Sequence, residues 1–380
     1  MVYLEQYLYI IFCIKKIIKY KVIFNMKEFK FLFNKLPFQI IFYPTSRCNA
    51  NCSHCYNFNR QINTTKNNEL SLDEINRISS GFGHIKALTI SGGEPFLRED
   101  LKEIISIFYK NNGLQYVSIH TNAFLTQKIS QTISEILQSL KGLNVVICIS
   151  IDGIGKLHDQ IRGVPDGFNK ATDTIKELKK IKKIFNNLYL VSSTMYSHST
   201  QDTFLQTFDY IQNEITGIKP SLSFIRGNTH INEEKNVNID GYENFYSKYK
   251  SIKDKSIKPL SPMALKETLE NIINKIVIKN HLTGKQSIPC QAGQKLVVIY
   301  ENGDVYPCET SNQKFGNLRD VNYDIKKLLC SKEGMKIKRK IKQDGCSCTW
   351  ENIILVNLIF NLKSYPAIIY NWFRLFILNK

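Results

Sequence analysis

The sequence predicts an α/β protein built on a parallel sheet, barrel-like or open, with helices covering the sheet. Between residues 40 and 226, short runs rich in β-branched and aromatic residues alternate with segments of helical periodicity at an even spacing. The chain has 380 residues, of which 22% are charged and 43% hydrophobic. This length and composition suit one large folded domain with a smaller second one.

The alternation resolves into strands and helices with definite bounds. The predicted strands are Gln39–Tyr43, Ile85–Ser91, Gln115–Thr121, Asn144–Asp152, Asn187–Met195 and Ser221–Arg226. The predicted helices between them are Leu72–Ser80, Asp100–Lys110, Lys128–Leu140, Phe168–Lys183 and Gln201–Gln212. Ser71, with Glu74 three residues later, predicts a capping box at the start of the first helix. In such folds the ligand binds at the carboxyl ends of the strands.

Three cysteines lie on the loop after the first predicted strand. Cys48, Cys52 and Cys55 have the spacing C-x3-C-x2-C, so one loop can wrap one metal centre. A structural zinc ion takes four protein ligands, and His54 is poorly placed to be the fourth because it directly precedes Cys55. A cubane iron–sulfur cluster held by three thiolates leaves one iron open to a substrate or cofactor. A disulfide with one spare thiol is the remaining alternative.

This loop is similar to the signature of the radical S-adenosylmethionine (SAM) superfamily, whose fold is a partial (β/α)6 barrel of TIM type. Ser91-Gly92-Gly93-Glu94-Pro95, after the second strand, resembles the family's GGEP segment. The resemblance implies a SAM-binding [4Fe–4S] cluster on Cys48, Cys52 and Cys55. It also implies that Gly92, Gly93 and Glu94 contact the methionine amino group of SAM. Consecutive glycines permit close approach of the backbone, and a carboxylate can pair with an ammonium group.

The same resemblance gives expected roles to three residues after the third and fourth strands. Asn122 would lie near the methionine moiety of SAM, and Ser150 would reach its ribose. Arg162 would meet the SAM carboxylate, or would form a structural ion pair with Asp159 or Asp166.

A second group of cysteines follows residue 280. Cys290 and Cys308 flank a predicted hairpin at residues 300–305, and this stretch resembles the start of the SPASM or twitch extension, which holds auxiliary iron–sulfur clusters. We therefore expect a small C-terminal domain of β-hairpin and helix with one auxiliary cluster. Its implied ligands are Cys290, Cys308, Cys346 and Cys348. Zinc is the alternative occupant, because four thiolates suit it equally well.

The remaining cysteines are interpreted as packing residues. Cys13 lies in an apolar run, Cys148 lies in mid-strand, and Cys330 is expected to be a buried thiol in the helical run Tyr323–Lys342. Asn352 stands where the family pattern leads us to expect a further cysteine, so an open iron at the auxiliary site is a second alternative.

The net charge of +18 comes from 51 lysine and arginine residues against 33 aspartate and glutamate residues. No zinc-finger, helix-turn-helix or RNA-binding signature accompanies this charge, so nucleic-acid binding is not expected. Both chain ends are apolar and basic. They fit either helices that lie on an anionic membrane surface or a helix pair packed on the protein's own core.

The expected organisation has five segments. Residues 1–37 are an apolar and basic N-terminal extension, residues 38–237 a radical SAM core, and residues 238–283 a helical linker. Residues 284–350 form an auxiliary-cluster domain, and residues 351–380 are an apolar, membrane-interfacial C-terminal tail.

The resemblance implies an oxidoreductase of maturase type. It would cleave SAM reductively to a 5′-deoxyadenosyl radical and abstract hydrogen from a peptide, a tetrapyrrole, or a lipid or glycan precursor. A reduced flavodoxin-type or ferredoxin-type donor would supply the electron. We expect a cytoplasmic enzyme of an anaerobe, with peripheral contact to the inner membrane face. Candidates for the general base, unranked, are Asp304, Glu309 and Arg226. The alternative is a non-catalytic iron–sulfur electron carrier or a zinc-stabilised binding module.

Overall fold

The computed structural model describes residues 36–252 and 261–378. Within these ranges the chain forms two compact units. The barrel unit comprises Leu36–Asn238 and Ala292–Arg339, and the helical unit comprises Ile239–Gln291 and the described residues from Lys340 onward. The cysteine-rich region predicted at 284–350 is thus divided between the two units, and the predicted linker lies within the helical unit.

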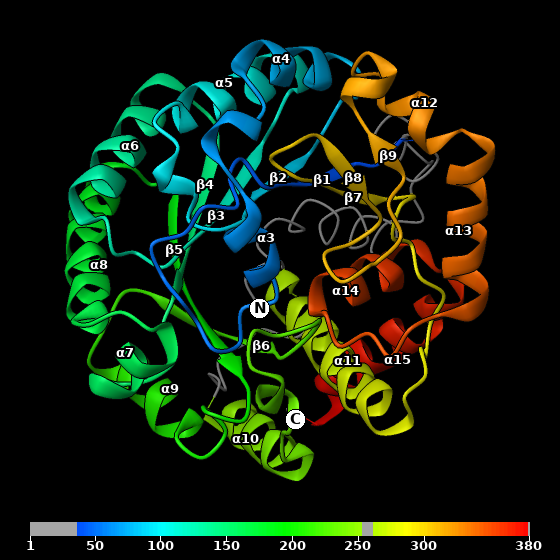
Figure 1. Cartoon of the computed structure of the whole chain (residues 1–380). Helices are drawn as coiled ribbons and strands as arrows, with labels where there is room; N and C mark the ends of the chain where they lie inside the picture. Colours follow the sequence, from blue (N-terminus) through cyan, green and yellow to red (C-terminus); the bar gives the residue numbers. More distant parts are fainter. Residues whose placement is uncertain (1–35, 253–260, 379–380) are drawn as a thin grey trace. The chain divides into compact units, whose positions relative to one another are not determined.

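A parallel sheet forms the centre of the barrel unit (Figure 1). Its first six strands are β1 (Gln39–Phe42), β2 (Ala87–Ile90), β3 (Tyr116–Thr121), β4 (Asn144–Ser150), β5 (Leu188–Tyr196) and β6 (Lys219–Phe224). Each strand pairs in parallel with the next one along the chain. All six predicted strands are therefore confirmed, with ends that differ by a few residues, and so is the partial (β/α)6 barrel.

Helices lie on the outer side of this curved sheet (Figure 1). They are α4 (Leu72–Ser80), α5 (Leu101–Asn112), α6 (Thr126–Ser139), α7 (Lys156–Arg162), α8 (Gly167–Ile184) and α9 (Phe204–Asn213). The capping box of Ser71 and Glu74 is present at the start of α4. The sequence did not predict α7, because a helix of seven residues is too short for clear periodicity.

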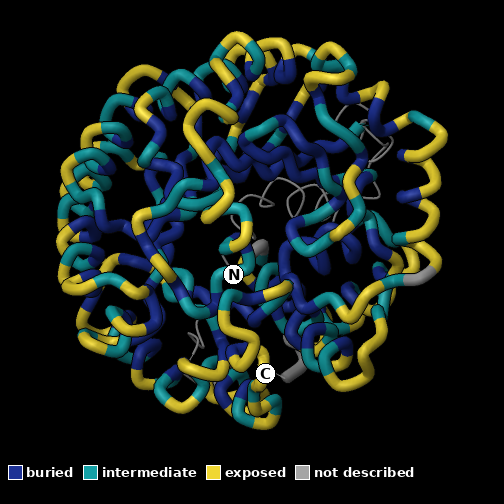
Figure 2. Tube along the Cα trace, viewed as in Figure 1, coloured by how far each residue is buried: buried dark blue, intermediate teal, exposed yellow. Residues whose placement is uncertain are grey.

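The core lies between the strands and the inner faces of these helices, as the burial of the strands in Figure 2 shows. Val145 to Ile149 on β4 are all buried, and the apolar face of α4 is buried through Ile75 and Ile78. Strands buried on both faces are typical of a parallel sheet with helical cover. Cys148 is completely buried in β4, which confirms its interpretation as a packing residue.

The C-terminal region extends the same sheet. The strands β7 (Leu296–Ile299), β8 (Asp304–Tyr306) and β9 (Gly316–Asn317) follow β1 in the order β1-β7-β8-β9. The predicted hairpin is confirmed, because β7 and β8 are antiparallel. The parallel pairing of β7 with β1, which sets Val297 opposite Ile40, was not predicted, because nothing local in sequence encodes a partner so distant along the chain.

Three further helical segments complete this region: the 3₁₀ turn η5 (Arg319–Val321), α12 (Ile325–Leu329) and α13 (Lys332–Asp344). Cys330 is the C-cap residue of α12 and is exposed. Its prediction as a buried thiol is wrong, because the helical run breaks at this position and turns the residue outward.

The helical unit contains α10 (Ile239–Ile252), α11 (Pro262–Thr283), α14 (Glu351–Phe360), the 3₁₀ turn η6 (Leu362–Ser364) and α15 (Tyr365–Leu378). Both α14 and α15 contact α11. Residues 351–359 of α14 are all buried, including Asn352. The C-terminal tail was expected either to lie on a membrane surface or to pack on the protein's own core, and α14 packs on the protein.

The second tail helix keeps an exposed aromatic face. Tyr370 is 66% exposed and Phe373 is 41% exposed, whereas Ile368 and Trp372 are buried. Among the described helices no single one is long and apolar enough to cross a bilayer, although α14 and α15 pass that test together across a bend of 94°. The N-terminal extension, with Cys13, lies outside the described residues except for Leu36 and Pro37.

Candidate active site

The cysteine triplet lies on the loop that leaves the carboxyl end of β1. The Cys55 N–H donates to the Cys52 carbonyl over 3.2 Å, so the last two cysteines share one tight turn. Burial raises the pKa of Cys48 to about 12 and that of Cys55 to about 11. Burial also raises the pKa of Cys52, although the Arg162 charge opposes this effect. Without a bound metal the three groups are therefore thiols, which release protons when a metal centre binds.

The glycines of the GGEP segment pack against the backbone of this loop. The Gly93 N–H donates to the Thr45 carbonyl over 3.0 Å, and the Glu94 N–H donates to the Arg47 carbonyl over 2.8 Å. A Cβ atom on Gly93 would lie 2.0 Å from the Arg47 carbonyl oxygen, and Gly92 has φ of +124°. These positions need glycine because the segment approaches the cysteine loop too closely for a side chain.

Glu94 is completely buried, and its carboxylate accepts three hydrogen bonds from within the barrel unit. The donors are the Thr121 hydroxyl at 2.9 Å, the Asn122 N–H at 2.8 Å and the Phe96 N–H at 3.2 Å. Burial raises the pKa of Glu94 to about 7, although these hydrogen bonds act in the opposite direction. Glu94 thus joins the end of β2 to the end of β3, in addition to any contact with SAM.

The other two predicted SAM contacts follow β3 and end β4. Asn122 Nδ2 lies 3.8 Å from Cys48 Sγ and donates to Asn49 Oδ1 over 2.7 Å. Asn122 therefore lies against the cysteine loop, and its contact with SAM stays a prediction. Ser150 is the last residue of β4 and is partly exposed, in register with Ser193 of β5.

Arg162 lies beside the cysteine loop and pairs with Asp152, just after the end of β4, a partner that the sequence did not predict for it. Its Nη2 atom forms an ion pair with Asp152 Oδ2, and its Nη1 atom donates to Cys52 Sγ over 3.6 Å. The predicted ion pair with Asp159 or Asp166 is wrong. The Asp159 carboxylate instead accepts from the N–H groups of Asp166 and Phe168, at 2.9 and 2.8 Å.

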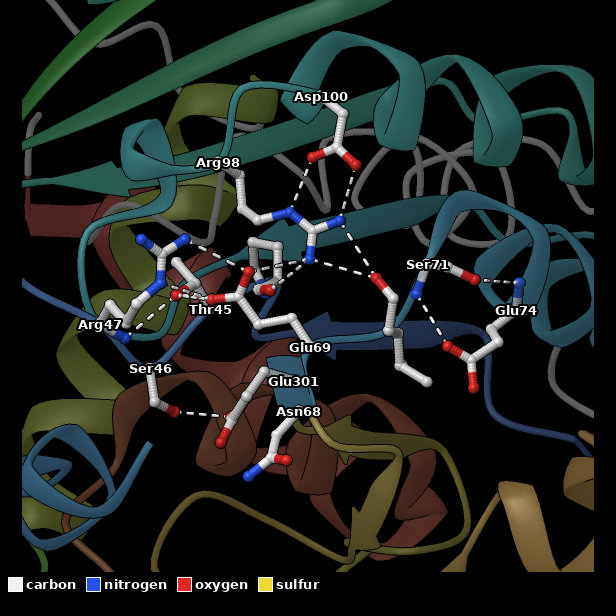
Figure 3. A network of polar contacts seen from close by, with 12 residues as sticks. Thr45, Ser46, Arg47, Asn68, Glu69, Ser71, Glu74, Arg98, Asp100 and Glu301 are labelled. Atoms are coloured by element: carbon white, nitrogen blue, oxygen red, sulfur yellow. Dashed lines mark hydrogen bonds and ion pairs between the residues drawn. The ribbon is translucent and has the colours of Figure 1, made fainter. Parts of the chain in front are cut away.

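A buried polar network fixes the segment between β1 and Cys48 (Figure 3). Glu69, whose side chain is 4% exposed, accepts from Thr45 Oγ1 and from Arg47 Nε, the latter over 2.8 Å. Arg98 donates to the Pro44 carbonyl over 3.1 Å and forms an ion pair with Glu69 over 3.4 Å. Sequence reasoning missed Glu69 and Arg98, because neither belongs to a spacing that marks a site.

The same network borders a cavity of about 330 Å³ on the barrel unit. The cavity is lined by Arg47, Lys66, Glu69, Leu70, Ser71, Leu97, Arg98, Glu99 and Asp100. The donors of Arg98 face this region but are used within the protein, including two contacts of 2.7 Å to Asp100.

The three candidates for the general base occupy two places. Arg226 Nη2 and Glu309 Oε2 form a buried ion pair at 3.1 Å, and Glu309 Oε1 accepts from the Tyr43 hydroxyl over 3.0 Å. The Tyr56 hydroxyl, one residue after Cys55, lies 3.1 Å from that of Tyr43. Asp304 is instead occupied in the hairpin, where Asn317 Nδ2 donates to it over 2.9 Å. Glu309 and Arg226 therefore lie with Tyr56 next to the cysteine loop.

The predicted auxiliary ligands are divided between the two units. Cys308 belongs to the barrel unit, whereas Cys290, Cys346 and Cys348 belong to the helical unit. In the helical unit, a hydrogen bond from Cys348 lowers the pKa of Cys346 to about 7 against the effect of burial. Asn280 Nδ2 donates to the Cys348 carbonyl over 2.8 Å.

The residues of the first cysteine loop fit a cluster held by thiolates. Among the residues that the structure describes, no three cysteine, histidine or carboxylate side chains already converge as they would around a single metal ion. The loop nevertheless supplies three thiols, and nitrogen donors from Asn122 and Arg162 point at two of the sulfurs. The buried Nε atom of Arg162 has no hydrogen-bond partner within the described chain. Nitrogen donors that point at ligand sulfurs stabilise metal-bound thiolates.

Two family models match the chain. The model for the radical SAM superfamily matches residues 42–211, and the model for an iron–sulfur cluster-binding domain, SPASM, matches residues 290–349. The matched ranges contain both predicted cysteine groups.

Relatives by sequence include an uncharacterised protein of Methanocaldococcus jannaschii, which is 26% identical over 80% of this chain and 92% of its own length. A GTP 3′,8-cyclase of Mannheimia succiniciproducens is 29% identical over 38% of this chain. The chain matches less than half of that cyclase, at 44% of its length.

Similar solved structures include anSMEcpe with bound AdoMet, at a TM-score of 0.55 and 16% identity over 88% of this chain and 99% of that one. SuiB of Streptococcus suis with bound S-adenosylmethionine has a TM-score of 0.55 and 17% identity, over 80% of this chain and 68% of that one. At this level of identity the likeness concerns the fold alone. The two family models, over residues 42–211 and 290–349, identify the chain as a member of the radical SAM superfamily with a SPASM domain, a family of enzymes that use a [4Fe–4S] cluster with SAM and auxiliary iron–sulfur clusters.

Proposed function

We propose that this enzyme cleaves SAM reductively at the loop of Cys48, Cys52 and Cys55 and uses the resulting 5′-deoxyadenosyl radical to abstract hydrogen from a substrate. The observation that carries the proposal is the placement of three thiols between the GGEP segment, Asn122 and Arg162 at the carboxyl end of the sheet. The bound cluster supplies the electron for the cleavage, which a reduced flavodoxin-type or ferredoxin-type carrier provides.

The chain's own residues place and shield the reactants. Gly92 and Gly93 leave room for the backbone to approach, and Glu94, Asn122 and Ser150 are the proposed SAM contacts. With a pKa of about 7, Glu94 has a substantial ionised fraction near neutral pH, and an adjacent ammonium group would increase that fraction. Glu94 and Asn122 are buried, which limits the access of water to a site where a radical must react with substrate alone.

We propose Cys290, Cys308, Cys346 and Cys348 as ligands of the auxiliary centre. That centre would bind substrate or accept the electron left on the product. The ion pair of Arg226 and Glu309 supports a substrate site near the first cluster, since Glu309 follows Cys308 and contacts Tyr43, whose hydroxyl meets that of Tyr56.

The substrate classes to test are peptides, tetrapyrroles, and lipid or glycan precursors. Relatives by sequence are named GTP 3′,8-cyclase and Fe-coproporphyrin III synthase, and similar folds were solved with the precursor peptide SuiA and with the Cp18Cys peptide. These names define a panel of candidate substrates for this enzyme.

The test of the reaction is anaerobic release of 5′-deoxyadenosine from SAM by the reconstituted full chain with a strong reductant. Cys52→Ala should abolish release, whereas Cys330→Ala should retain it, because Cys330 is an exposed cysteine outside both ligand sets. Release that persists in Cys52→Ala would contradict the assignment of the site.

We further propose a cytoplasmic enzyme that contacts an anionic membrane through α15. Tyr370 and Phe373 are exposed on this helix, as is Leu362 before it, and Lys363 and Arg374 flank them with positive charge. Aromatic residues beside cations suit the headgroup region of a bilayer.

Co-sedimentation with vesicles of phosphatidylglycerol and phosphatidylcholine tests this contact. The double variant Tyr370→Ser, Phe373→Ser should lose binding. Ile184→Ser serves as a control, because it removes an exposed apolar side chain from the barrel unit. Equal binding by the native chain and both variants would contradict the proposed contact.

A further inference from the structure

One of the three cysteine sulfurs lies against a buried positive charge. Nη1 of Arg162 donates to Cys52 Sγ over 3.6 Å, and Nη2 pairs with Asp152. The Arg162 side chain is 10% exposed and that of Asp152 is fully buried. Solvent therefore screens the charges of this pair only weakly, and their effect on a neighbouring sulfur is strong.

The backbone fixes this guanidinium close to the cysteine loop. Arg162 ends α7, and its carbonyl accepts from the Asn51 N–H over 2.9 Å. One residue earlier, the Ile161 carbonyl accepts from the Ser53 N–H over 3.0 Å. A Cβ atom on Gly163 would lie 2.7 Å from the Asn51 carbonyl, so the helix end and the loop are in direct contact. These contacts hold the end of the helix that carries Arg162 against the segment that carries Cys52.

Asp152 holds the guanidinium from the other side. Its Oδ1 atom accepts from the Met195 N–H over 2.8 Å, which ties it to β5, and its Oδ2 atom lies 3.5 Å from His54 Nε2. The Asp152 N–H donates to His158 Nδ1 over 3.2 Å. Arg162, which contacts the Cys52 sulfur, and Asp152, which pairs with Arg162, are the charged groups of this arrangement.

We propose that Arg162, positioned by Asp152, raises the reduction potential of the cluster that Cys52 binds. Reduction adds one electron, and hence one negative charge, to the cluster and its thiolates. A cationic N–H donor to a ligand sulfur stabilises the reduced form more than the oxidised form. Arg162 is in this sense a positioning and tuning residue, and its effect on the chemistry passes through Cys52. The proposal rests on the proposed function, since it takes Cys52 as a ligand of the SAM-binding cluster.

The experiment is an EPR-monitored redox titration of the reconstituted full chain without SAM, following the signal that Cys52→Ala abolishes. Arg162→Gln should move the midpoint potential to a more negative value. Arg162→Lys should give a smaller negative shift than Arg162→Gln, because lysine keeps the positive charge but loses the forked geometry. Asp152→Asn should move the midpoint the opposite way, to a more positive value, because it removes the negative charge beside the guanidinium.

The control is Arg319→Gln, which changes the net charge of the chain equally but lies in a surface ion pair with Glu74. It should leave the midpoint unchanged. A midpoint that is also unchanged in Arg162→Gln, or shifts of the same sign in Arg162→Gln and Asp152→Asn, would overturn the proposal. If Arg162→Gln fails to assemble a cluster, the test uses the other two variants. The midpoint should be more negative than that of the native chain in Arg162→Lys and more positive in Asp152→Asn, and any other pair of signs would overturn the proposal.

The same samples distinguish a failure of the tuning role from a failure of the proposed function. If Arg162 serves only to bind the SAM carboxylate, Arg162→Gln weakens SAM binding and leaves the SAM-free midpoint unchanged, which overturns the tuning role. If Cys52→Ala retains the full EPR signal and iron content, the proposed function itself fails. Loss of that signal in Cys52→Ala with an unshifted Arg162→Gln counts against the tuning role alone.

Discussion

The Ser46 hydroxyl donates a hydrogen bond of 2.6 Å to Glu301 Oε2, across a separation of 255 residues in the chain. Ser46 precedes Cys48 by two residues, and Glu301 lies in the turn between β7 and β8. Both residues are buried within the barrel unit. The loop that carries the first cysteine group is therefore supported by the hairpin that begins the SPASM region.

Removal of this support should weaken both the fold and the cysteine loop. Glu301→Ala leaves the buried Ser46 hydroxyl without its acceptor, and we expect a loss of about 1–3 kcal/mol in the free energy of unfolding. Urea denaturation measures this loss, and iron analysis should show poorer cluster loading. Glu301→Gln keeps an acceptor oxygen and should retain most of the stability. Equal stability of the Ala and Gln variants would contradict the role of the contact.

Glu69 should contribute more to the free energy of unfolding than Glu99, which lines the same cavity. Glu69→Ala leaves the buried Arg98 without one of its partners and the Thr45–Arg47 segment without its anchor (Figure 3). We expect a loss of about 1–3 kcal/mol, because donors of Thr45, Arg47 and Arg98 lose their acceptor, although Asp100 still pairs with Arg98.

Glu99→Ala is the matched control for this change, since Glu99 lines the cavity but is exposed. Its effect should stay within about 0.5 kcal/mol. Thermal or urea unfolding of the two variants under the same conditions makes the comparison, and similar losses in both would count against the network.

Gly93→Ala should prevent assembly of the cysteine loop. The added Cβ would lie 2.0 Å from the Arg47 carbonyl oxygen and 2.6 Å from that of Ser46, and backbone atoms can relieve such contacts only by moving the loop. We expect a large loss of iron bound at the first cluster. Gly81→Ala is the control, because its Cβ would meet no atom closer than 3.3 Å. Normal iron content in Gly93→Ala would show that the loop tolerates the displacement.

Glu94 should make the stability of the cluster-free protein depend on pH. Its pKa is raised from 4.5 unfolded to about 7 folded, so the folded state binds the extra proton between these values. The contribution of Glu94 to stability is thus fully present below about pH 4.5 and is lost as pH rises through about 7, by about 3 kcal/mol.

The measurement is the free energy of unfolding by urea at several pH values between 4.5 and 8. Glu94→Gln removes the titrating group, so the decline attributable to this residue should vanish even if the variant is less stable at every pH. A variant whose stability declines with pH as steeply as that of the native chain would show that other groups cause the dependence.

The sequence by itself determined the alternation of strands and helices and the presence of two cysteine groups. The period of apolar residues decides which segments bury a face, and this information is local, so β1 to β6 and the capping box of Ser71 and Glu74 follow from it. Cys48, Cys52 and Cys55 are equally local, since eight consecutive residues contain all three thiols. The short spacing limits them to one metal centre whatever the rest of the chain does.

Only the tertiary structure decided which residues surround the cysteine loop. The pairing of β7 with β1, the ion pair of Arg162 with Asp152, and the hydrogen bond of Ser46 to Glu301 all join segments that are separate along the chain. The sequence contains many charged residues and does not show which of them meet. In the fold, burial reduces solvent screening at these contacts, so the interaction between the two residues that do meet becomes strong. The exposure of Cys330 and the burial of α14 have the same origin, because both depend on where a helix ends and on what packs against it.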